Sequence, residues 1–313
     1  MTTHQTTAAT DALLAAVQAG VRLVELGQPF FTGMPCSPNH PGFRMTLIRR
    51  HGDMVRPDGG SASNEIIVTG GHVGTHVDAL SHVSHDGLLY GGVDAAAAQT
   101  GGRFKELGAE HTPALLTRGV LLDVAATKGV DVLPPGYGVT AGDLTDAADR
   151  AGVALRKGDV ALVRTGWARH FEDAATYLGQ EDGVPGATTD AGEWLAAAGV
   201  VATGADTTAY EQIPAGAGHS VLPVHRILLV RSGINIIEHL DLEAAAARLL
   251  PRTSSTRRAT SSRRPSGSPD ARVSTASAAR RATTVGAVMP RLPRRDARGS
   301  RCRPRCAAGP SRT

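Results

Sequence analysis

Residues 71–82 read Gly-His-Val-Gly-Thr-His-Val-Asp-Ala-Leu-Ser-His, and four of their side chains can bind a divalent metal or move a proton. These four, at positions 72, 76, 78 and 82, would all face one side of a straight strand. At roughly 3.3 Å per residue, however, His76 and His82 would then lie about 20 Å apart, too far for one metal ion. The chain must therefore bend here, and Gly71 and Gly74 are the residues that permit a bend.

The residues just before this stretch support the same interpretation. A strand over residues 65–69, followed by a sharp turn, would bring the imidazoles and the carboxylate to one point. The alternative is a solvated loop that happens to contain several histidines. We expect a metal site. Because its ligands would be imidazole and carboxylate without thiolate, zinc and manganese both suit it.

Length and composition set the broad class of protein. The chain has 313 residues, enough for one large domain or two small ones. It has no apolar run of membrane-spanning length and no secretory leader, so we expect a cytoplasmic protein. Of its three cysteines only Cys36 precedes residue 300, which excludes a disulfide framework. Cys36 could be a nucleophile, although an ordinary loop cysteine is the simpler interpretation.

The net charge of +4 conceals two oppositely charged parts. Residues 251–313 contain 16 Arg, no Lys and two Asp, a charge of +14, so residues 1–250 carry −10. This tail has one Leu and no aromatic residue, so it cannot bury enough apolar surface to fold, and we expect it to be disordered. Three origins stay open: a functional basic arm, a natural extension, or a shifted reading frame in GC-rich DNA.

Short β-branched runs alternate with helical patterns before residue 250, which predicts a single α/β domain. The patterns also indicate a short helix over 11–19 and a surface excursion over 87–118. The predicted strands span residues 21–26, 45–49, 65–69, 119–124, 159–164, 200–203 and 234–238. The predicted helices span residues 141–151 after a Thr140 cap, 190–198 after a Thr189 cap, 221–231 after a Ser220 cap, and 241–250.

The spacing His72-x-x-x-His76-x-Asp78-x-x-x-His82 resembles the signature of the cyclase family of metal-dependent hydrolases, which includes kynurenine formamidases and isatin hydrolases. The resemblance implies a β/β/α swivelling-type domain over residues 1–250 and a homo-oligomer. Further matches follow in the family's order along some 220 residues. These are residues 21–26 with Gly33-Met34-Pro35, residues 158–167, residues 204–207 and residues 225–238.

The resemblance also implies which residues bind the metal. One or two zinc or manganese ions would be held by His72, His76, Asp78, His225 and Glu238. The carboxylates of Asp78 and Glu238 would be shared between the two ions where both are present. The spacing alone predicts only that His72, His76 and Asp78 converge; the other roles follow from the resemblance.

Some assignments can be weighed from the sequence itself. Glu238 shares strand parity with two isoleucines, so it points into an apolar layer where a carboxylate needs a cation or a salt bridge. His225 would lie on the apolar face of its helix, where a histidine is more often a core residue. His219 is the competing ligand from this region, and His85 is a nearby candidate that the motif does not require.

The implied reaction is hydrolysis of an amide, formamide or cyclic amide C–N bond in a small molecule, as in an arylformamidase. A metal-activated water would be the nucleophile, and His82 would take its proton and return it to the leaving nitrogen. Relatives that act on kynurenine-type substrates place an aromatic residue where this chain has Met34. We therefore expect Met34 to line the substrate site and to favour a different substrate.

The sequence departs from the family pattern at its end. The family usually closes with an apolar strand, whereas the tail offers only Gly-Ser-Pro at 267–269, so a sheet edge or a pocket wall would be incomplete. The alternatives are a lyase or ring-closing cyclase that uses the same metal, and an inactive metal-binding product of a disrupted gene. We expect no membrane partner, and nucleic acid at most through non-specific contacts of the basic tail.

Overall fold

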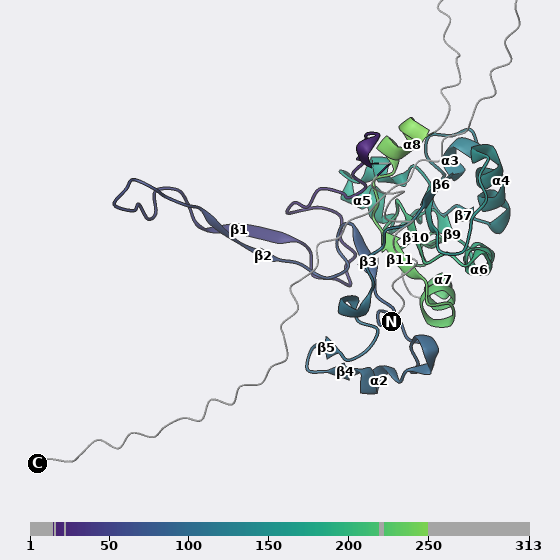
Figure 1. Ribbon diagram of the computed structural model, residues 1–313, viewed down its shortest axis with the longest axis horizontal. Helices are drawn as coiled ribbons and strands as arrows, with labels where there is room; N and C mark the ends of the chain where they lie inside the picture. Colours follow the sequence, from purple (N-terminus) through teal and green to yellow (C-terminus); the bar gives the residue numbers. More distant parts are fainter. Residues whose placement is uncertain (1–14, 16, 22, 219–221, 250–313) are drawn as a thin grey trace, which may run out of the picture.

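The computed structural model describes residue 15 and residues 17–21, 23–218 and 222–249 (Figure 1). They form a central sheet with helices packed on it and a two-stranded arm that projects from this body. The α/β class predicted from the sequence is thereby confirmed. The tail, His219 and most of the helix predicted over 11–19 lie outside the described residues.

The central sheet has five strands, and its order is β3-β11-β10-β8-β6. Four strands run parallel, and β3 pairs antiparallel with β11 at one edge. The four predicted strands at 119–124, 159–164, 200–203 and 234–238 are confirmed, with ends that shift by one or two residues. The strands are β3 (His76–Asp78), β6 (Gly119–Asp123), β8 (Val160–Arg164), β10 (Ala202–Ala205) and β11 (Asn235–Glu238).

Helices cover both faces of this sheet. On one face, α4 (Ala141–Ala151), α6 (Thr189–Ala198) and the pair α7 (Pro223–His225) and η4 (Arg226–Arg231) pack on a large apolar cluster. On the other face, α8 (Glu243–Leu249) packs on a second cluster. Burial of both sheet faces explains why the parallel strands are almost continuously apolar.

The predicted helix caps are confirmed in part. Thr140 caps α4 through a capping box with Asp143, as predicted. The cap predicted at Thr189 is wrong by one residue, because Thr189 is already helical and Thr188 is the N-cap. The Thr188 hydroxyl instead donates to the Val139 carbonyl. Ser220, the third predicted cap, lies outside the described residues.

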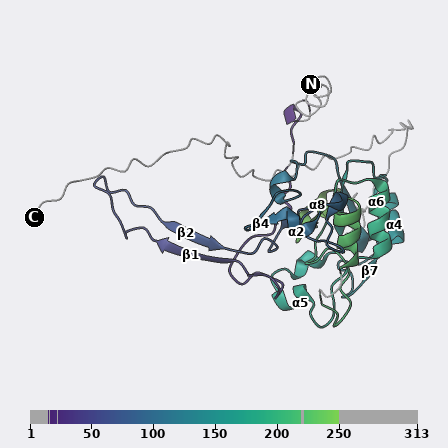
Figure 2. The ribbon, with the colours of Figure 1, turned by 90° about the horizontal axis from the view of Figure 1, so that it is seen from below.

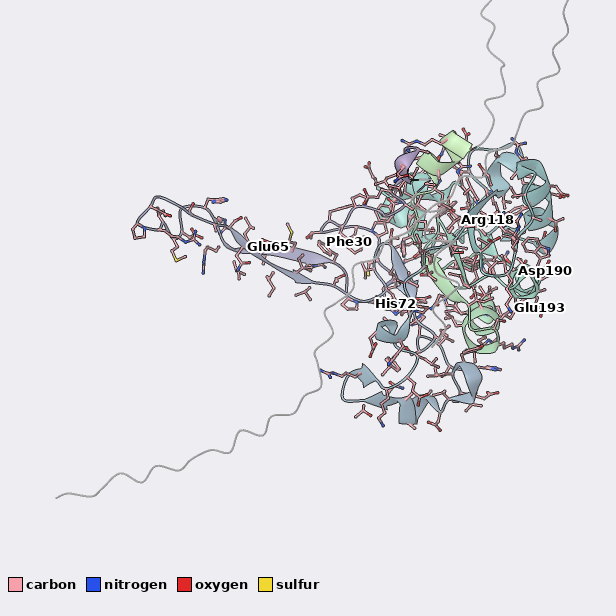
Figure 3. The ribbon with its side chains drawn as sticks, viewed as in Figure 1. Phe30, Glu65, His72, Arg118, Asp190 and Glu193 are labelled. Carbon is pink, nitrogen blue, oxygen red and sulfur yellow. The ribbon has the colours of Figure 1, made fainter. Side chains whose placement is uncertain are left out.

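The arm is a hairpin of β1 (Arg44–Arg49) and β2 (Asn64–Val68), and both strands are exposed along their whole length. These are the strands predicted over 45–49 and 65–69. Figure 2 shows the same projection from a second side. In Figure 3 Glu65 lies on the arm and His72 where the arm meets the body. β2 therefore belongs to the arm, and the metal motif enters the central sheet through the separate strand β3.

The strand predicted over 21–26 is wrong. Its neighbour Gly27 forms only an isolated bridge with Leu240, and the Asp241 N–H donates to the Leu26 carbonyl over 2.8 Å. Leu26 packs against the sheet, while Leu23 is 85% exposed. No adjacent strand continues the pairing along the described residues of this segment.

Short elements make up the rest of the body, including the predicted surface excursion. In the described part of the chain, no helix combines the length and the apolarity that crossing a membrane would require. The short elements are η1 (Tyr90–Gly92), α2 (Ala95–Ala98), β4 (Gln99–Thr100), β5 (Arg103–Phe104), η2 (Ala109–His111), α3 (Val124–Thr127), β7 (Gly138–Val139), η3 (Trp167–His170), α5 (Ala174–Leu178) and β9 (Gly186–Ala187).

Candidate metal centre

The pairing of β3 with β11 places three predicted ligands on one face of the sheet. His76 lies opposite Glu238 in the ladder, and Asp78 lies opposite Ile236. The Asn235 amide donates to the Asp78 carbonyl over 2.7 Å and so fixes this register. Glu238 is the last residue of β11, and in α/β sheets ligands bind at the carboxyl ends of the parallel strands.

The bend that the motif requires has two parts. Gly74 has a φ of +64°, and a Cβ there would lie 2.7 Å from Met34 Cε and from Phe30 Cζ, so the position needs glycine. A Cβ added at Gly71 would meet no atom within 4 Å, and Gly71 has no positive φ. The structure therefore does not require glycine at position 71. Beyond β3, the His82 N–H donates to the Ala79 carbonyl, and this turn brings His82 back to the site.

The five predicted metal ligands converge. His72 Nδ1 lies 2.9 Å from Asp78 Oδ1, and His76 Nε2 lies 3.4 Å from the same oxygen. His225 Nε2 lies 3.6 Å from Asp78 Oδ2 and 3.4 Å from Glu238 Oε1. Glu238 Oε2 in turn lies 3.6 Å from His76 Nε2. A ring of imidazoles therefore surrounds two carboxylates.

Two further histidines supply donor atoms to this ring. Among the described residues, three groups of His, Asp and Glu donors have all their atoms within 4.8 Å of one another. One of these groups contains His82, and another contains His239, which the sequence reasoning did not single out. The groups are His72, Asp78 and His82; Asp78, His225 and Glu238; and His76, Glu238 and His239.

The residues fit a divalent cation. Both carboxylate oxygens of Asp78 are buried and accept no hydrogen bond. The exposed side-chain fraction is 1% for Asp78, 3% for His225 and 8% for Glu238. Two carboxylates in such a space are costly unless a cation compensates their charge. Imidazole and carboxylate donors suit zinc and manganese alike.

The buried carboxylates and imidazoles of the site shift one another's pKa. Burial opposes ionisation of Asp78, but the neighbouring imidazoles outweigh burial and hold its pKa well below the usual range. Burial and the charge of Asp78 together raise the pKa of Glu238. Burial opposes a proton on His76, yet Asp78 and Glu238 raise its pKa to about 9. Without a cation, protonated imidazole therefore compensates the negative charge of the two carboxylates.

His82 differs from the other histidines of the ring. Burial lowers its pKa to about 4, although the charge of Asp78 acts in the opposite direction. Its ring stacks on His72 with centroids 3.8 Å apart. The ring is therefore uncharged at neutral pH, and its position beside the ligands, not its pKa, agrees with the proton-carrying role expected of this residue.

Glu211 is a buried residue of the site that sequence reasoning missed. Its carboxylate accepts hydrogen bonds from the backbone N–H groups of Val224 and His225, each over 3.0 Å. It also lies 2.5 Å from His225 Nδ1. A carboxylate on one imidazole nitrogen fixes the tautomer and turns the other nitrogen to the metal. Its flanking residues, Tyr210 and Gln212, form no helix or strand pattern, so the sequence carries no signal for this role.

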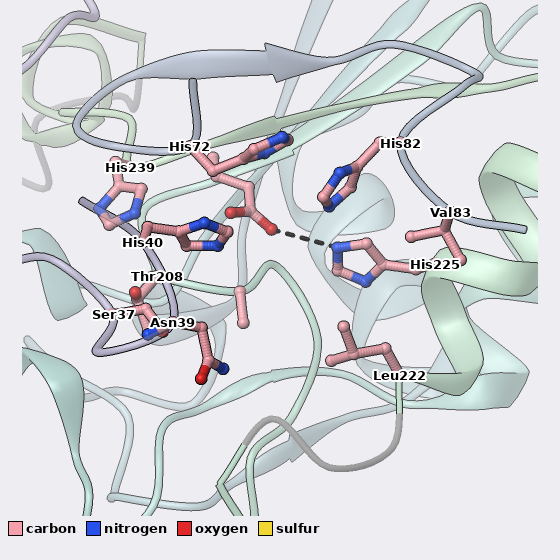
Figure 4. A pocket seen from close by; sticks show the side chains of 12 residues that line it. Ser37, Asn39, His40, His72, His82, Val83, Thr208, Leu222, His225 and His239 are labelled. Carbon is pink, nitrogen blue, oxygen red and sulfur yellow. Dashed lines mark hydrogen bonds and ion pairs between the residues drawn. The ribbon is translucent and has the colours of Figure 1, made fainter. Parts of the chain in front are cut away.

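An open pocket gives access to the ring (Figure 4). His40 is part of its wall and stacks on His72 with centroids 5.2 Å apart. The dashed line in Figure 4 marks the ion pair between His225 and Glu238. The described residues that line the pocket include no Phe, Tyr or Trp. They are Ser37, Asn39, His40, His72, His82, Val83, Thr208, Ala209, Leu222, His225, Glu238 and His239.

Other predicted residues lie away from this pocket. Met34 is 5% exposed and packs in an apolar cluster beneath Gly74, not among the side chains that line the pocket. Burial raises the pKa of the Cys36 thiol, which donates to the Ser37 and His40 carbonyls, so a nucleophilic role is disfavoured. His85 belongs to no donor group found in the described part of the chain.

Comparison with known proteins identifies the family. The Cyclase family model matches residues 24–212, which is more than half of the chain. This chain belongs to the cyclase family. A crystal structure of a novel cyclase is similar, with 28% identity, a TM-score of 0.66, and coverage of 76% of this chain and 82% of that one. None of the curated proteins compared with this chain matches it.

Two isatin hydrolases share the cyclase-family fold. One is bound to the product analogue thioisatinate, at 22% identity and a TM-score of 0.58, with 77% of this chain and 88% of that one covered. The other, isatin hydrolase A from Ralstonia solanacearum, is 21% identical with a TM-score of 0.54, and 77% and 87% are covered. These two comparisons establish the fold alone.

Proposed function

We propose that this cyclase-family chain is a metal-dependent hydrolase that cleaves an amide, formamide or cyclic amide C–N bond in a small molecule. The observation that carries the proposal is the convergence of imidazole and carboxylate donors on Asp78 beside an open pocket. The fold shared with isatin hydrolases supports hydrolysis over other metal-assisted reactions.

Five residues of the site would bind the metal. His72, His76, Asp78, His225 and Glu238 would hold the cation. A bound divalent cation supplies a Lewis acid that activates water and polarises a carbonyl oxygen. Because the carboxylates are buried, solvent would screen their attraction to the cation only weakly.

His82 would move the proton. It would accept a proton from the attacking water and donate it to the leaving nitrogen, so that the amine departs neutral. Its place in the pocket wall, stacked on His72 and within 4.8 Å of the Asp78 donors, brings it to the reacting groups. A second histidine, His40, lines the same pocket and stacks on His72.

The pocket suits a small substrate with polar groups. Ser37, Asn39 and Thr208 supply hydrogen-bonding groups on one side, while Val83 and Leu222 supply apolar contacts on the other. An aryl substrate gains from stacking on an aromatic ring, and the described lining offers only imidazoles for it. We therefore expect a substrate other than a kynurenine-type aryl formamide.

A substrate panel tests this function. Metal-loaded protein would be assayed with N-formylkynurenine, isatin and a series of small aliphatic amides and cyclic amides. We expect turnover of at least one amide, with a kcat/KM for N-formylkynurenine below that of the best substrate. A clear preference for N-formylkynurenine would contradict the substrate proposal, and no turnover of any amide by metal-loaded protein would contradict hydrolysis.

We also propose that the chain assembles with copies of itself through the arm. A two-stranded hairpin is marginal in water by itself, and exposed apolar patches mark interfaces. The exposed fractions are 63% for Ile48, 55% for Ile67 and 57% for Val68. Light scattering should show an oligomer that Ile67→Lys dissociates and that Glu193→Lys, on α6, leaves intact. A monomeric wild type would contradict this assembly.

A further inference from the structure

The end of β11 breaks the alternation of a strand. Side chains of consecutive strand residues point to opposite faces of a sheet. Glu238 and His239 are consecutive, yet their donor atoms and that of His76 lie within 4.8 Å of one another. The backbone must therefore turn sharply between these two residues, so that both side chains reach the same point.

The turn is made by an unusual backbone conformation. His239 has a φ of +56°, in the left-handed region that residues other than glycine rarely adopt. Two hydrogen bonds hold it there: its N–H donates to the Thr207 carbonyl over 3.0 Å, and its carbonyl accepts from Thr75 Oγ1 over 2.6 Å. The Gln28 N–H donates to the same hydroxyl oxygen over 2.8 Å. The surrounding structure thus imposes the strained conformation.

The His239 ring lies between an apolar layer and the donor ring. It is 3% exposed, and its centroid lies 5.5 Å from that of Tyr177 and 5.8 Å from that of His76. In Figure 4, His239 and His225 stand on opposite sides of the pocket. Packing alone would not call for an imidazole in a strained backbone, since an apolar side chain on a relaxed strand end would fill this space.

We propose that His239 is a further metal ligand, which with His76 and Glu238 forms a second cation position beside that of Asp78, His225 and Glu238. The two oxygens of Glu238 already face different imidazoles, Oε1 toward His225 and Oε2 toward His76. One carboxylate can thus serve both positions. The ligand class is a divalent cation that accepts mixed imidazole and carboxylate donors. This inference rests on the metal site of the proposed function and adds to it a ligand outside the motif.

Titration of the chelator-treated protein with Co²⁺ tests the proposal without an activity assay. Visible absorption and calorimetry would follow the wild type, His239→Asn and His85→Asn. Asparagine tolerates the left-handed conformation, so the variant removes the imidazole and keeps the turn. We expect two bound Co²⁺ in the wild type. Loss of a ligand should weaken one of them by more than the roughly 10–100-fold that follows loss of an outer contact, and should change its absorption bands. His85→Asn should bind as the wild type does.

The outcomes separate this inference from the site as a whole. Co²⁺ affinities and bands in His239→Asn equal to those of the wild type would overturn the role of His239, provided that His76→Ala weakens binding. Absence of any Co²⁺ binding by the wild type would overturn the proposed metal site itself. If circular dichroism shows that His239→Asn does not fold, His239→Gly repeats the measurement, because glycine adopts this φ without strain.

Discussion

The two walls of the metal centre are built in different ways. The buried wall consists of Asp78, Glu211, His225 and Glu238, and Glu211 holds His225 there through hydrogen bonds to its ring and its backbone N–H. The open wall consists of His40, His72 and His82, and its rings stack on one another in the pocket. The exposed side-chain fraction is 3% for His225 but 28% for His72.

This difference indicates a division of tasks. On the buried wall, Glu211 fixes the imidazole of His225 through its ring and its backbone, so the donor direction is set before any ligand arrives. On the open wall, stacked imidazoles meet both the donors and the incoming substrate. Substitutions in the buried wall should therefore change metal binding, and substitutions of open-wall residues that are not ligands should change catalysis.

The largest effect should come from Asp78→Asn, because this carboxylate contacts imidazoles of both walls. We expect loss of stoichiometric metal and of all hydrolase activity. Binding stabilises the folded state by about 2.7 kcal/mol at a free ligand concentration of 100 Kd. EDTA should thus lower the Tm of the wild type and leave that of the variant unchanged. Stoichiometric metal in Asp78→Asn would remove this residue from the ligand set.

His82→Ala should lose catalysis but keep the metal. Positioned proton transfer contributes about 10²–10⁴-fold, so kcat should fall by a factor in that range on any amide that the wild type hydrolyses. Metal content by mass spectrometry should equal that of the wild type. If the variant loses metal as readily as His72→Ala, His82 belongs among the ligands; if kcat is unchanged, it has no part in the mechanism.

Glu211→Gln should weaken metal binding to an intermediate degree. The amide cannot accept hydrogen bonds from both backbone groups and from the His225 ring, so the imidazole loses its fixed orientation. Such outer contacts typically contribute about 10–100-fold to metal affinity. Competition with a chelator would measure the change, with Glu193→Gln, an exposed change on α6, as the control. Equal affinities in the two variants would refute a positioning role for Glu211.

The smallest effect should follow removal of residues 251–313. The sequence predicts that the tail does not fold, and every wall residue lies before residue 240. We expect unchanged metal content, and higher solubility because a +14 segment no longer accompanies a −10 body. Loss of metal or of the folded state in the truncated protein would contradict the interpretation of the tail.

The sequence predicted the local part of the site well. Residues 72–82 carry the motif within one short segment, and parity along its strand correctly predicted that Glu238 is buried on the same sheet face as Ile236, although its neighbours there are imidazoles. The helix at 141–151 was readable because its capping box and apolar face are local signals. These features depend on neighbours within a few residues, which is why one sequence suffices for them.

The missed features depend on contacts between distant segments. β3 has three residues, and its strand geometry exists only because β11, some 160 residues later, pairs with it. Glu211 orients His225 from 14 residues away through a loop that carries no periodic pattern. The left-handed conformation of His239 is held by Thr75 and Thr207, and the modest preference of histidine for this region is too weak to predict it from the sequence.

The metal content of the protein as purified, measured by elemental mass spectrometry for the wild type and His76→Ala, tests the central claim most directly. His76 contacts both Asp78 and Glu238, and so links the two carboxylates of the ring. We predict near-stoichiometric zinc or manganese in the wild type and a large loss in the variant, with the fold retained by circular dichroism. The same metal content in both proteins would contradict the account.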